Sequence, residues 1–384
     1  MCAIHPEPPG GGDLFGRPHH ANPAPRGSTW HENARLLSRH RLTPVPSDRQ
    51  IWAYRIEVPE ADGWGLQAGD SVELRLLSSR PLADAVAALL RSSPETRAAE
   101  ASLRSATAQL PVLELRTPTK ALIQCLADRT GDAALRQLTE DPAQLLATAQ
   151  RVDVLELLRR HPQVLTLQDL QDLLPPVRPR AYSLAAVPHP GEPLELLVRT
   201  VRYERDGRVQ VGTVSGALER LPAPGGNLYV RPRPAPLFHL PDPLGTDVLL
   251  IGSGVGIAPF HAFLQERRAR RDPGRAWLIF GLRNREEDLL YRRDLQSWKR
   301  DGTLWRLDLA ESRPETPPAR HVQKVLLHAR EQVRAFLRGG AHVYVCGGAH
   351  TVGLGVRDAL IQVLDGEDAL MELAAEGRHH EDVY

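Results

Sequence analysis

Several features that mark specialised protein classes are scarce in this sequence. Only three cysteines occur among 384 residues, Cys2, Cys125 and Cys346, too far apart for a disulfide framework or a zinc site of the usual paired spacing. The formal net charge is +1, without the basic excess typical of a dedicated nucleic-acid binder. No uninterrupted apolar run approaches the length of a membrane span, and the N-terminus lacks the apolar core of a secretory signal. These absences predict a soluble protein of the reducing cytoplasm.

Two common catalytic motifs are missing as well. Gly212-Thr-Val-Ser-Gly216 has the wrong spacing for a Gly-x-Ser-x-Gly nucleophile elbow, and no Gly-x-x-x-x-Gly-Lys-Ser/Thr phosphate loop occurs. His379-His380-Glu381-Asp382 resembles a metal-binding tract, but a solvated tail explains these polar residues more simply. The sequence therefore predicts neither a serine hydrolase nor a phosphate-loop enzyme, and no metal site.

The composition is otherwise that of an ordinary globular protein. Hydrophobic residues make up 42% and charged residues 25% of the chain, whose length suits two or three domains. The first residues differ, because six prolines and five glycines fall within residues 1–29. We expect a disordered tail over residues 1–33.

Strand patterns flank a helical stretch in the first part of the chain. Apolar and polar residues alternate in Ile51–Val58 and Ser71–Leu76, and strand character returns at Pro179–Leu184, Leu194–Val201, Arg208–Val211 and Asn227–Arg231. In between, residues 81–174 are rich in leucine and alanine at helical spacing, and one helix is expected to begin after Pro118. These patterns predict an antiparallel β unit with a helical insertion. The proline cluster Pro232–Pro243 predicts a linker after it.

Strands and helices alternate in the last part of the chain. The predicted strands are Val248–Ile251, Ala276–Phe280, Leu304–Leu309 and His342–Val345. The predicted helices are Phe260–Arg270, Asp288–Lys299, Val322–Arg338 and Gly355–Leu364. This order is typical of a doubly wound parallel sheet, whose ligand crevice lies at the carboxyl ends of the strands.

A glycine-rich turn follows the first of these strands. The apolar run Val248–Ile251 leads into Gly252, Gly254 and Gly256, and a helix is expected to open near Pro259. Glycine allows a tight turn and a close approach to a ligand, and the amides at the start of a helix attract phosphate. Such turns also occur in proteins that bind no nucleotide. The residues at the neighbouring strand ends are therefore needed to indicate whether this turn binds one.

Cationic and hydroxyl side chains follow the next strands. Arg283 and Arg285 come after the second strand, where an NAD-selective site normally has an acidic residue. Ser312 and Arg313 come after the third strand, and a hydroxyl with a guanidinium suits a phosphate monoester. Cys346 ends the fourth strand. Together they predict a dinucleotide site that prefers NADPH to NADH.

Seven motifs then point to one family. In chain order they are Arg180-Ala-Tyr-Ser183, Gly212–Leu218, Ile251–Phe260, Glu287–Tyr291, Leu309–Arg313, Val343–Gly347 and Glu381–Tyr384. Together they resemble the FAD/NADP(H) module of the diflavin reductases, within the ferredoxin–NADP reductase superfamily, and most of all the sulfite reductase flavoproteins. The resemblance implies a discontinuous FAD-binding β-barrel over residues 34–80 and 175–240. It also implies a helical connecting insertion over 81–174 and an NADP(H)-binding domain over 241–384.

The resemblance assigns FAD contacts to two motifs and to the last residue. Arg180 would bind the FAD pyrophosphate, Tyr182 would pack on the isoalloxazine ring, and Ser183 would reach the flavin nitrogen that accepts hydride. Because side chains alternate along a strand, Ser183 needs a local twist to do so. Tyr384 would cover the flavin until nicotinamide displaces it. The pyrophosphate would also lie on Gly212, Thr213, Val214 and Ser215, which otherwise read as the start of a capped surface helix.

The resemblance also assigns the NADPH contacts and the catalytic residues. NADPH would be bound by Gly252, Gly254, Gly256, Arg283, Ser312, Arg313, Arg320 and Gln323. Ser183, Cys346 and Asp382 would act beside the nicotinamide, with Asp382 stabilising its positive charge as hydride leaves. One motif departs from the family, whose usual Lys-x-Tyr pair ahead of Val-Gln is replaced in Ala319-Arg-His-Val-Gln323. Arg320 or His321 would have to substitute.

The implied function is that of an NADPH-dependent FAD flavoprotein oxidoreductase, plausible as a sulfite reductase flavoprotein-type component. No flavodoxin-like FMN segment precedes the module in the sequence, so we expect electrons to pass to a separate FMN protein, flavodoxin, or haem or iron–sulfur subunit. Two alternatives stay open at this point. One is a flavodoxin or ferredoxin–NADP reductase, and the other is a subunit that holds FAD in an assembly without turnover.

Overall fold

The computed structural model describes residues 30–45, 47, 49–59, 61–78, 80–90, 110–205, 208–313, 318 and 320–384. Most of the predicted tail, residues 91–109 of the predicted insertion and Ala319 lie outside this set. The described residues form two compact units, one within 75–180 and 201–221 and the other within 30–74, 181–200 and 222–384. The second unit contains strands of the β unit together with the C-terminal sheet, so the two units do not coincide with the predicted domains. The domain boundaries therefore stay a prediction.

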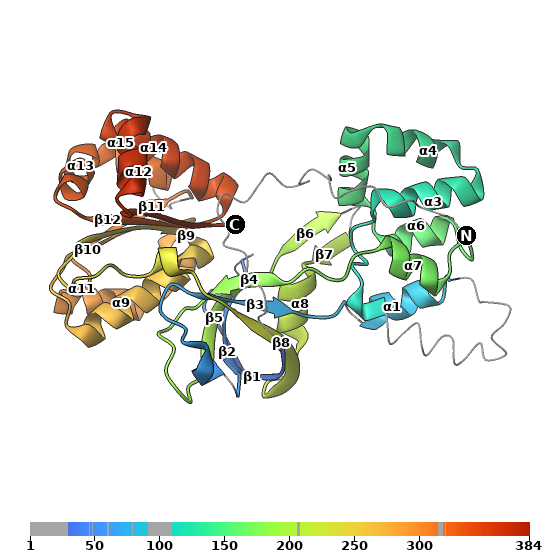
Figure 1. Cartoon of the computed structure of the whole chain (residues 1–384), viewed down its shortest axis with the longest axis horizontal. Helices are drawn as coiled ribbons and strands as arrows, with labels where there is room; N and C mark the ends of the chain where they lie inside the picture. The colour runs from blue at the N-terminus through green and yellow to red at the C-terminus, as the bar shows by residue number, and fades with distance from the viewer. Residues whose placement is uncertain are drawn as a thin grey trace. The chain divides into compact units, whose positions relative to one another are not determined.

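An antiparallel sheet of six strands carries the β unit (Figure 1). Its strands are β1 (His31–Arg41), β2 (Ile51–Glu57), β3 (Ser71–Arg75), β4 (Arg180–Ser183), β5 (Leu194–Arg199) and β8 (Gly225–Arg233), in the order β4-β3-β8-β1-β2-β5. Alternate residues such as Leu36, Tyr54 and Leu196 are buried, as the alternating sequence requires. β1 begins at His31, within the residues assigned to the tail.

The insertion is helical, as predicted. Its helices are α1 (Arg80–Ala87), α3 (Lys120–Thr130), α4 (Ala133–Glu140), α5 (Pro142–Arg151), α6 (Val154–Arg160) and α7 (Leu167–Leu173). Thr119 caps α3 by accepting a hydrogen bond from the Leu122 N–H, which explains the helix start after Pro118. The leucine and alanine stripes form a buried core. The same unit contains the hairpin of β6 (Arg202–Arg205) and β7 (Arg208–Val211), followed by α8 (Thr213–Arg220).

A parallel five-stranded sheet forms the last part of the chain and confirms the doubly wound prediction. Its strands are β9 (Val248–Ser253), β10 (Ala276–Leu282), β11 (Arg306–Glu311), β12 (His342–Gly347) and β13 (His379–Val383), in the order β11-β10-β9-β12-β13. Figure 1 shows α9 (Ala258–Arg270) and α11 (Arg292–Asp301) on one face of the sheet. The other face carries α12 (Val322–His328), α13 (Arg330–Arg338), α14 (Leu354–Leu364) and α15 (Glu367–Ala375). Leu250 and Leu249 accordingly belong to different cores.

Two predicted helices are each divided in the structure. The predicted helix 322–338 breaks at Ala329, whose φ of −94° and ψ of 17° separate α12 from α13. The predicted helix 288–299 is replaced by α10 (Arg285–Asp288) and α11, separated by Tyr291 at a φ of 52°. Tyr291 stacks on His261 with ring centroids 3.7 Å apart, so tertiary packing overrides the local helical pattern.

The prediction of a solvated tail at 379–382 is wrong. These residues belong to β13, which pairs in parallel with β12 and whose five residues are all partly buried. A strand at the edge of a sheet needs few apolar residues, and the sequence His-His-Glu-Asp-Val therefore gives no strand signal. Among the helices of the described residues, none is long and apolar enough to cross a bilayer.

Candidate functional site

The carboxyl edge of the parallel sheet has a point where the strand order reverses. From β9 the chain proceeds to β10 and β11 on one side and then crosses to β12 and β13 on the other. The reversal therefore lies between β9 and β12, with the glycine turn directly after β9. Open parallel sheets bind their ligands at such a point.

The three glycines of the turn meet different surroundings. A Cβ on Gly256 would lie 2.4 Å from the Cys346 carbonyl oxygen, and a Cβ on Gly252 would lie 2.8 Å from the Phe260 ring. Gly254 instead has a φ of +56° and nothing within 4 Å of an added Cβ. Gly252 and Gly256 are therefore required for packing inside the protein, whereas Gly254 is required for an open backbone turn. No side chain caps the start of α9 after this turn.

Ser183, Cys346 and Asp382 converge at the same edge. The Ser183 hydroxyl, at the end of β4, donates a hydrogen bond of 2.8 Å to Asp382 Oδ2 in β13. The Cys346 Sγ, at the end of β12, lies 4.0 Å from the same oxygen. One carboxylate oxygen thus brings together three residues that lie far apart in the sequence and that were predicted to share a site.

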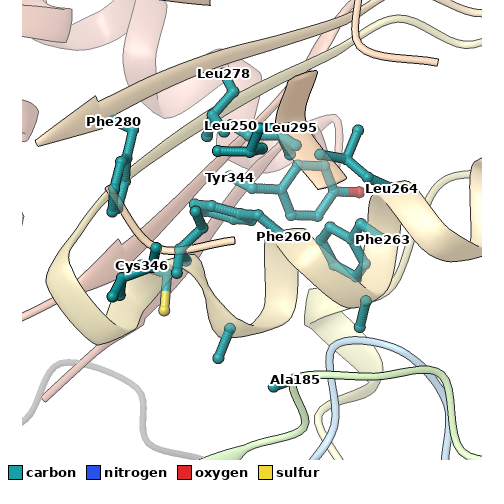
Figure 2. Close-up of a cluster of buried hydrophobic side chains, with 14 of the residues drawn as sticks. Ala185, Leu250, Phe260, Phe263, Leu264, Leu278, Phe280, Leu295, Tyr344 and Cys346 are labelled. Carbon is teal, nitrogen blue, oxygen red and sulfur yellow. The ribbon is translucent and has the colours of Figure 1, made fainter. Parts of the chain in front are cut away.

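Cys346 is buried, with the sulfur at the margin of a cluster of apolar side chains (Figure 2). Burial, with a smaller effect from the nearby Asp382 carboxylate, raises the pKa of the Cys346 thiol well above its usual value. The side chain is therefore a neutral thiol at physiological pH rather than a thiolate. This agrees with a packing role and argues against nucleophilic catalysis.

The backbone of Tyr384 is fixed by two hydrogen bonds. Its N–H donates to the Gly347 carbonyl at 3.1 Å, and its carbonyl accepts from the Ala349 N–H at 2.8 Å. The side chain is nevertheless 60% exposed. An aromatic ring held in this way at the edge of the sheet can stack on a planar ligand.

Two arginines that follow β10 are engaged in ion pairs. Arg283 Nε donates to the buried Asp288 at 3.1 Å, and Arg285 Nε donates to Glu311 at 2.7 Å. Although partial burial opposes it, hydrogen bonding from Arg285 lowers the pKa of Glu311. Sequence reasoning missed both carboxylates, although each stands inside one of the seven motifs. Arg283 therefore has a structural partner in addition to its predicted role.

The other predicted phosphate contacts lie after β11, and we call the ends of β10 and β11 with the residues that follow them the rim. Backbone hydrogen bonds hold these residues in place. The Arg313 N–H bonds the Arg283 carbonyl at 2.8 Å, and the Arg320 N–H bonds the Glu311 carbonyl at 2.7 Å. Both side chains are exposed, and Ser312 lies next to Arg313 in the same turn. Gln323 is half-buried in α12 against Gly355, where an added Cβ would approach its amide nitrogen to 3.0 Å. Arg313 and Arg320 thus have exposed guanidinium groups, whereas the Ser312 hydroxyl donates to the Leu282 carbonyl at 3.3 Å.

The Gly212 turn belongs to the first unit, as does Arg180. Gly212 precedes α8 without a side-chain cap, so the first amides of the helix lack a side-chain acceptor. The buried Ser215 hydroxyl accepts a hydrogen bond from the Val201 N–H at 3.1 Å, and the Val214 side chain is buried too. This helix start therefore offers backbone amides to an anion, whereas Ser215 already serves the fold. Arg180 is exposed, and Tyr182, in the second unit, is half-buried.

The residues fit a nicotinamide dinucleotide and a flavin. The open turn at Gly254, the two uncapped helix starts, the exposed arginines and the anchored Tyr384 ring are features that nucleotides and planar rings require. Within the described ranges, no group of three or more His, Cys, Asp or Glu side chains is arranged to hold a metal ion.

Comparisons with known proteins agree with the geometry. Residues 250–352 match the family model of the oxidoreductase NAD-binding domain. The chain is 32% identical, over 91% of its length, to the sulfite reductase (NADPH) flavoprotein alpha-components of Mannheimia succiniciproducens and Neisseria meningitidis. It is 33% identical, over the same share, to that of Sodalis glossinidius. In each case it spans 60% of the relative's own length.

Proposed function

We propose that this chain, which carries an oxidoreductase NAD-binding domain and is related over 91% of its length to sulfite reductase flavoprotein alpha-components, is an NADPH-dependent FAD flavoprotein oxidoreductase. It takes hydride from NADPH and passes electrons to an acceptor protein. One observation carries the proposal: Ser183, Cys346 and Asp382 meet at the carboxyl edge of the sheet, beside the glycine turn of the NAD-binding domain.

FAD, when bound, supplies the flavin that accepts hydride from the nicotinamide. The protein contributes alignment and charge. The Asp382 carboxylate stabilises the positive charge that the nicotinamide gains, and the hydrogen bond from Ser183 holds this carboxylate in place. Cys346 packs as a neutral thiol, and Tyr384 covers the flavin until the nicotinamide displaces its ring.

A preference for NADPH would arise at the ends of β10 and β11. Ser312, Arg313 and Arg320 bind the 2′-phosphate, since a hydroxyl and two exposed guanidinium groups offer charge-assisted hydrogen bonds. Arg283 and Gln323 support this rim from their partly buried positions. Gly252, Gly254 and Gly256 shape the turn on which the NADPH pyrophosphate rests, with Gly254 leaving room for it.

The FAD contacts that we propose follow the motifs. Tyr182 packs on the isoalloxazine ring and Arg180 binds the pyrophosphate. The amides of Gly212, Thr213, Val214 and Ser215 bind the pyrophosphate as well, because no side chain caps this helix start.

The acceptor that we propose is an FMN protein, a flavodoxin, or a haem or iron–sulfur subunit. The relatives' name includes sulfite reductase, which favours a role in sulfite reduction. That the acceptor is a separate polypeptide stays a prediction. We also propose a cytoplasmic location, because both cysteines of the described residues are buried and neither forms a disulfide.

Purification followed by anaerobic titration tests the proposal. The protein should be yellow and release FAD on denaturation, and NADPH should bleach it faster than NADH does. A colourless protein that takes up no FAD would contradict the enzyme function. A yellow protein that ignores NADPH would favour the assembly subunit instead. Affinity capture with the reduced protein as bait would then identify the acceptor and separate the sulfite reductase role from that of a flavodoxin or ferredoxin reductase.

A further inference from the structure

Two neighbouring pairs of residues lie on one face of strands β12 and β13. In the parallel register, Cys346 stands opposite Asp382, and Tyr344 stands opposite His380. Residues two apart in a strand point to the same side, so the Tyr344–His380 pair adjoins the Cys346–Asp382 pair. The rings of Tyr344 and His380 stack with centroids 4.3 Å apart and planes 11° apart. Tyr344 is fully buried and lies among Phe260, Phe263 and Leu264 in Figure 2.

A short segment that precedes the parallel sheet accepts hydrogen bonds from both rings of this pair. The Tyr344 hydroxyl donates to the His239 carbonyl at 2.7 Å, and His380 Nδ1 donates to the Leu237 carbonyl at 2.6 Å. Phe238, between these two carbonyls, packs edge-on against the Tyr344 ring at 5.5 Å. We call residues Ala235–His239 the clamp segment. It falls within the proline-rich stretch that the sequence marks only as a linker.

The protonation state of His380 suits this arrangement. Burial lowers the pKa of His380 to about 4, so the ring is neutral at neutral pH. A neutral ring that donates from Nδ1 must accept at Nε2, and His342 Nδ1 lies 3.1 Å from this atom. The Nδ1–H tautomer of His342 would supply the donor that His380 Nε2 requires.

One buried carboxylate fixes the clamp segment in turn. Asp70 is 1% exposed, and its Oδ1 accepts from the Ala235 N–H at 2.6 Å and from His239 Nε2 at 2.7 Å. Its other oxygen accepts from the Gln67 N–H at 2.8 Å. The Asp70 carbonyl accepts from the Leu184 N–H at 2.9 Å, and Leu184 directly follows Ser183. Asp70 is therefore bonded to the clamp segment and to the strand end that carries Ser183.

We propose that Asp70, the clamp segment, Tyr344 and His380 form a positioning network that sets Ser183, Cys346 and Asp382 in register with one another. The inference rests on the proposed function of that site. Tyr344 and His380 lie two positions before Cys346 and Asp382, and Leu184, whose N–H bonds the Asp70 carbonyl, directly follows Ser183. Hydride transfer depends steeply on alignment, and a displacement of about 1 Å can lower a rate about 100-fold.

Variants that remove one or two hydrogen bonds of the network test it. Tyr344→Phe keeps the stacked ring but loses the bond to the clamp segment, and His380→Phe does the same on β13. Trp277→Phe is the matched control, because it removes a partly buried bond of 2.7 Å from Trp277 Nε1 to Asp308 in the same sheet, on the face away from Tyr344. Rapid mixing of the FAD-loaded protein with NADPH gives the rate of flavin reduction and the NADPH dissociation constant, and thermal unfolding gives stability.

We expect both network variants to reduce flavin about tenfold more slowly at an unchanged NADPH dissociation constant. The control should lose stability without this loss of rate. Asp70→Asn tests the network independently if Tyr344→Phe or His380→Phe folds poorly. It should likewise slow flavin reduction at an unchanged NADPH dissociation constant. Unchanged rates in the network variants, or an equal loss in Trp277→Phe, would overturn the inference alone. An unmodified protein that NADPH does not reduce would instead contradict the proposed function, and the inference with it.

Discussion

The Gly256→Ala substitution tests how closely the glycine turn packs against β12. The added Cβ would lie 2.4 Å from the Cys346 carbonyl oxygen, 2.8 Å from the Cys346 carbonyl carbon and 3.1 Å from the Gly347 Cα. All three are backbone atoms, which cannot rotate away as the end of a side chain would. Either the turn or the carboxyl end of β12 must move, and the second movement displaces Cys346.

The expected cost follows from the overlap. Overpacking a well-packed interior costs about 1–3 kcal/mol, and we expect the upper half of this range because backbone atoms are involved. A unit of this size loses about 2–4 °C in Tm for each kcal/mol, so the Tm should fall by about 4–12 °C. Flavin reduction by NADPH should slow about 10–100-fold, because the overlap falls on the residue predicted to lie beside the nicotinamide.

Urea unfolding and thermal unfolding measure the loss of stability, and rapid-mixing reduction measures the rate. Gly63→Ala is the matched control, because nothing lies within 4 Å of a Cβ at Gly63 and its φ is not left-handed. The control should change stability by less than about 0.5 kcal/mol and leave the rate unchanged. If Gly256→Ala matches Gly63→Ala in both stability and rate, the inference that the glycine turn packs closely against β12 is wrong.

Three further substitutions address charge at the site and in the network. Asp382→Asn keeps the shape of the side chain but removes its charge, so flavin reduction should slow about 10–100-fold at unchanged NADPH affinity, and an unaltered rate would argue against electrostatic stabilisation. Arg313→Ala should raise the NADPH dissociation constant about tenfold and leave that of NADH unchanged, as measured by titration; equal weakening of both would exclude a contact to the 2′-phosphate. Burial lowers the pKa of His380 from 6.5 to about 4, so its contribution to stability is complete above pH 6.5 and is lost as the pH falls towards 4, because the unfolded chain binds the proton first. The loss amounts to up to about 3 kcal/mol. Urea unfolding at pH 7 and pH 5 should show that the wild-type protein loses more free energy of unfolding than His380→Phe does. The two proteins would respond alike to pH if His380 titrated normally.

The elements with strong local patterns were predictable from the sequence. The apolar run Val248–Ile251, the glycines after it and the helix at Pro259 form β9, the turn and α9 as expected. The alternation of strands and helices after residue 241 correctly indicates a doubly wound sheet. These predictions succeed because hydrophobic periodicity reflects which side of each element is buried.

The elements that depend on tertiary contacts were not predictable. β13 has a polar sequence, and its strand form depends on pairing with β12. The break at Tyr291 depends on stacking with His261, and the Tyr291 hydroxyl bonds Glu195 at 3.1 Å. The role of Asp70 depends on a partner 169 residues away, His239, which no local pattern reveals.

The candidate site shows the same division. The motifs identify Ser183, Cys346 and Asp382 as residue types, but only the folded chain brings Ser183 and Asp382 to 2.8 Å across 199 positions. The charges of Arg283 and Arg285 are visible in the sequence, whereas their pairing with Asp288 and Glu311 is not. Sequence therefore predicts the chemistry of the rim better than it predicts which cations are already paired.

Hydride transfer from NADPH to the flavin can be measured in a single turnover. The FAD-loaded chain is mixed anaerobically with NADPH, or with NADPH deuterated at the transferred position, and the loss of flavin absorbance is followed. We predict rapid bleaching by NADPH, slower bleaching by the deuterated substrate, and a further loss of rate in Asp382→Asn. A flavin that stays oxidised, or a rate that neither deuterium nor Asp382→Asn alters, would contradict hydride transfer at the edge where Ser183, Cys346 and Asp382 meet.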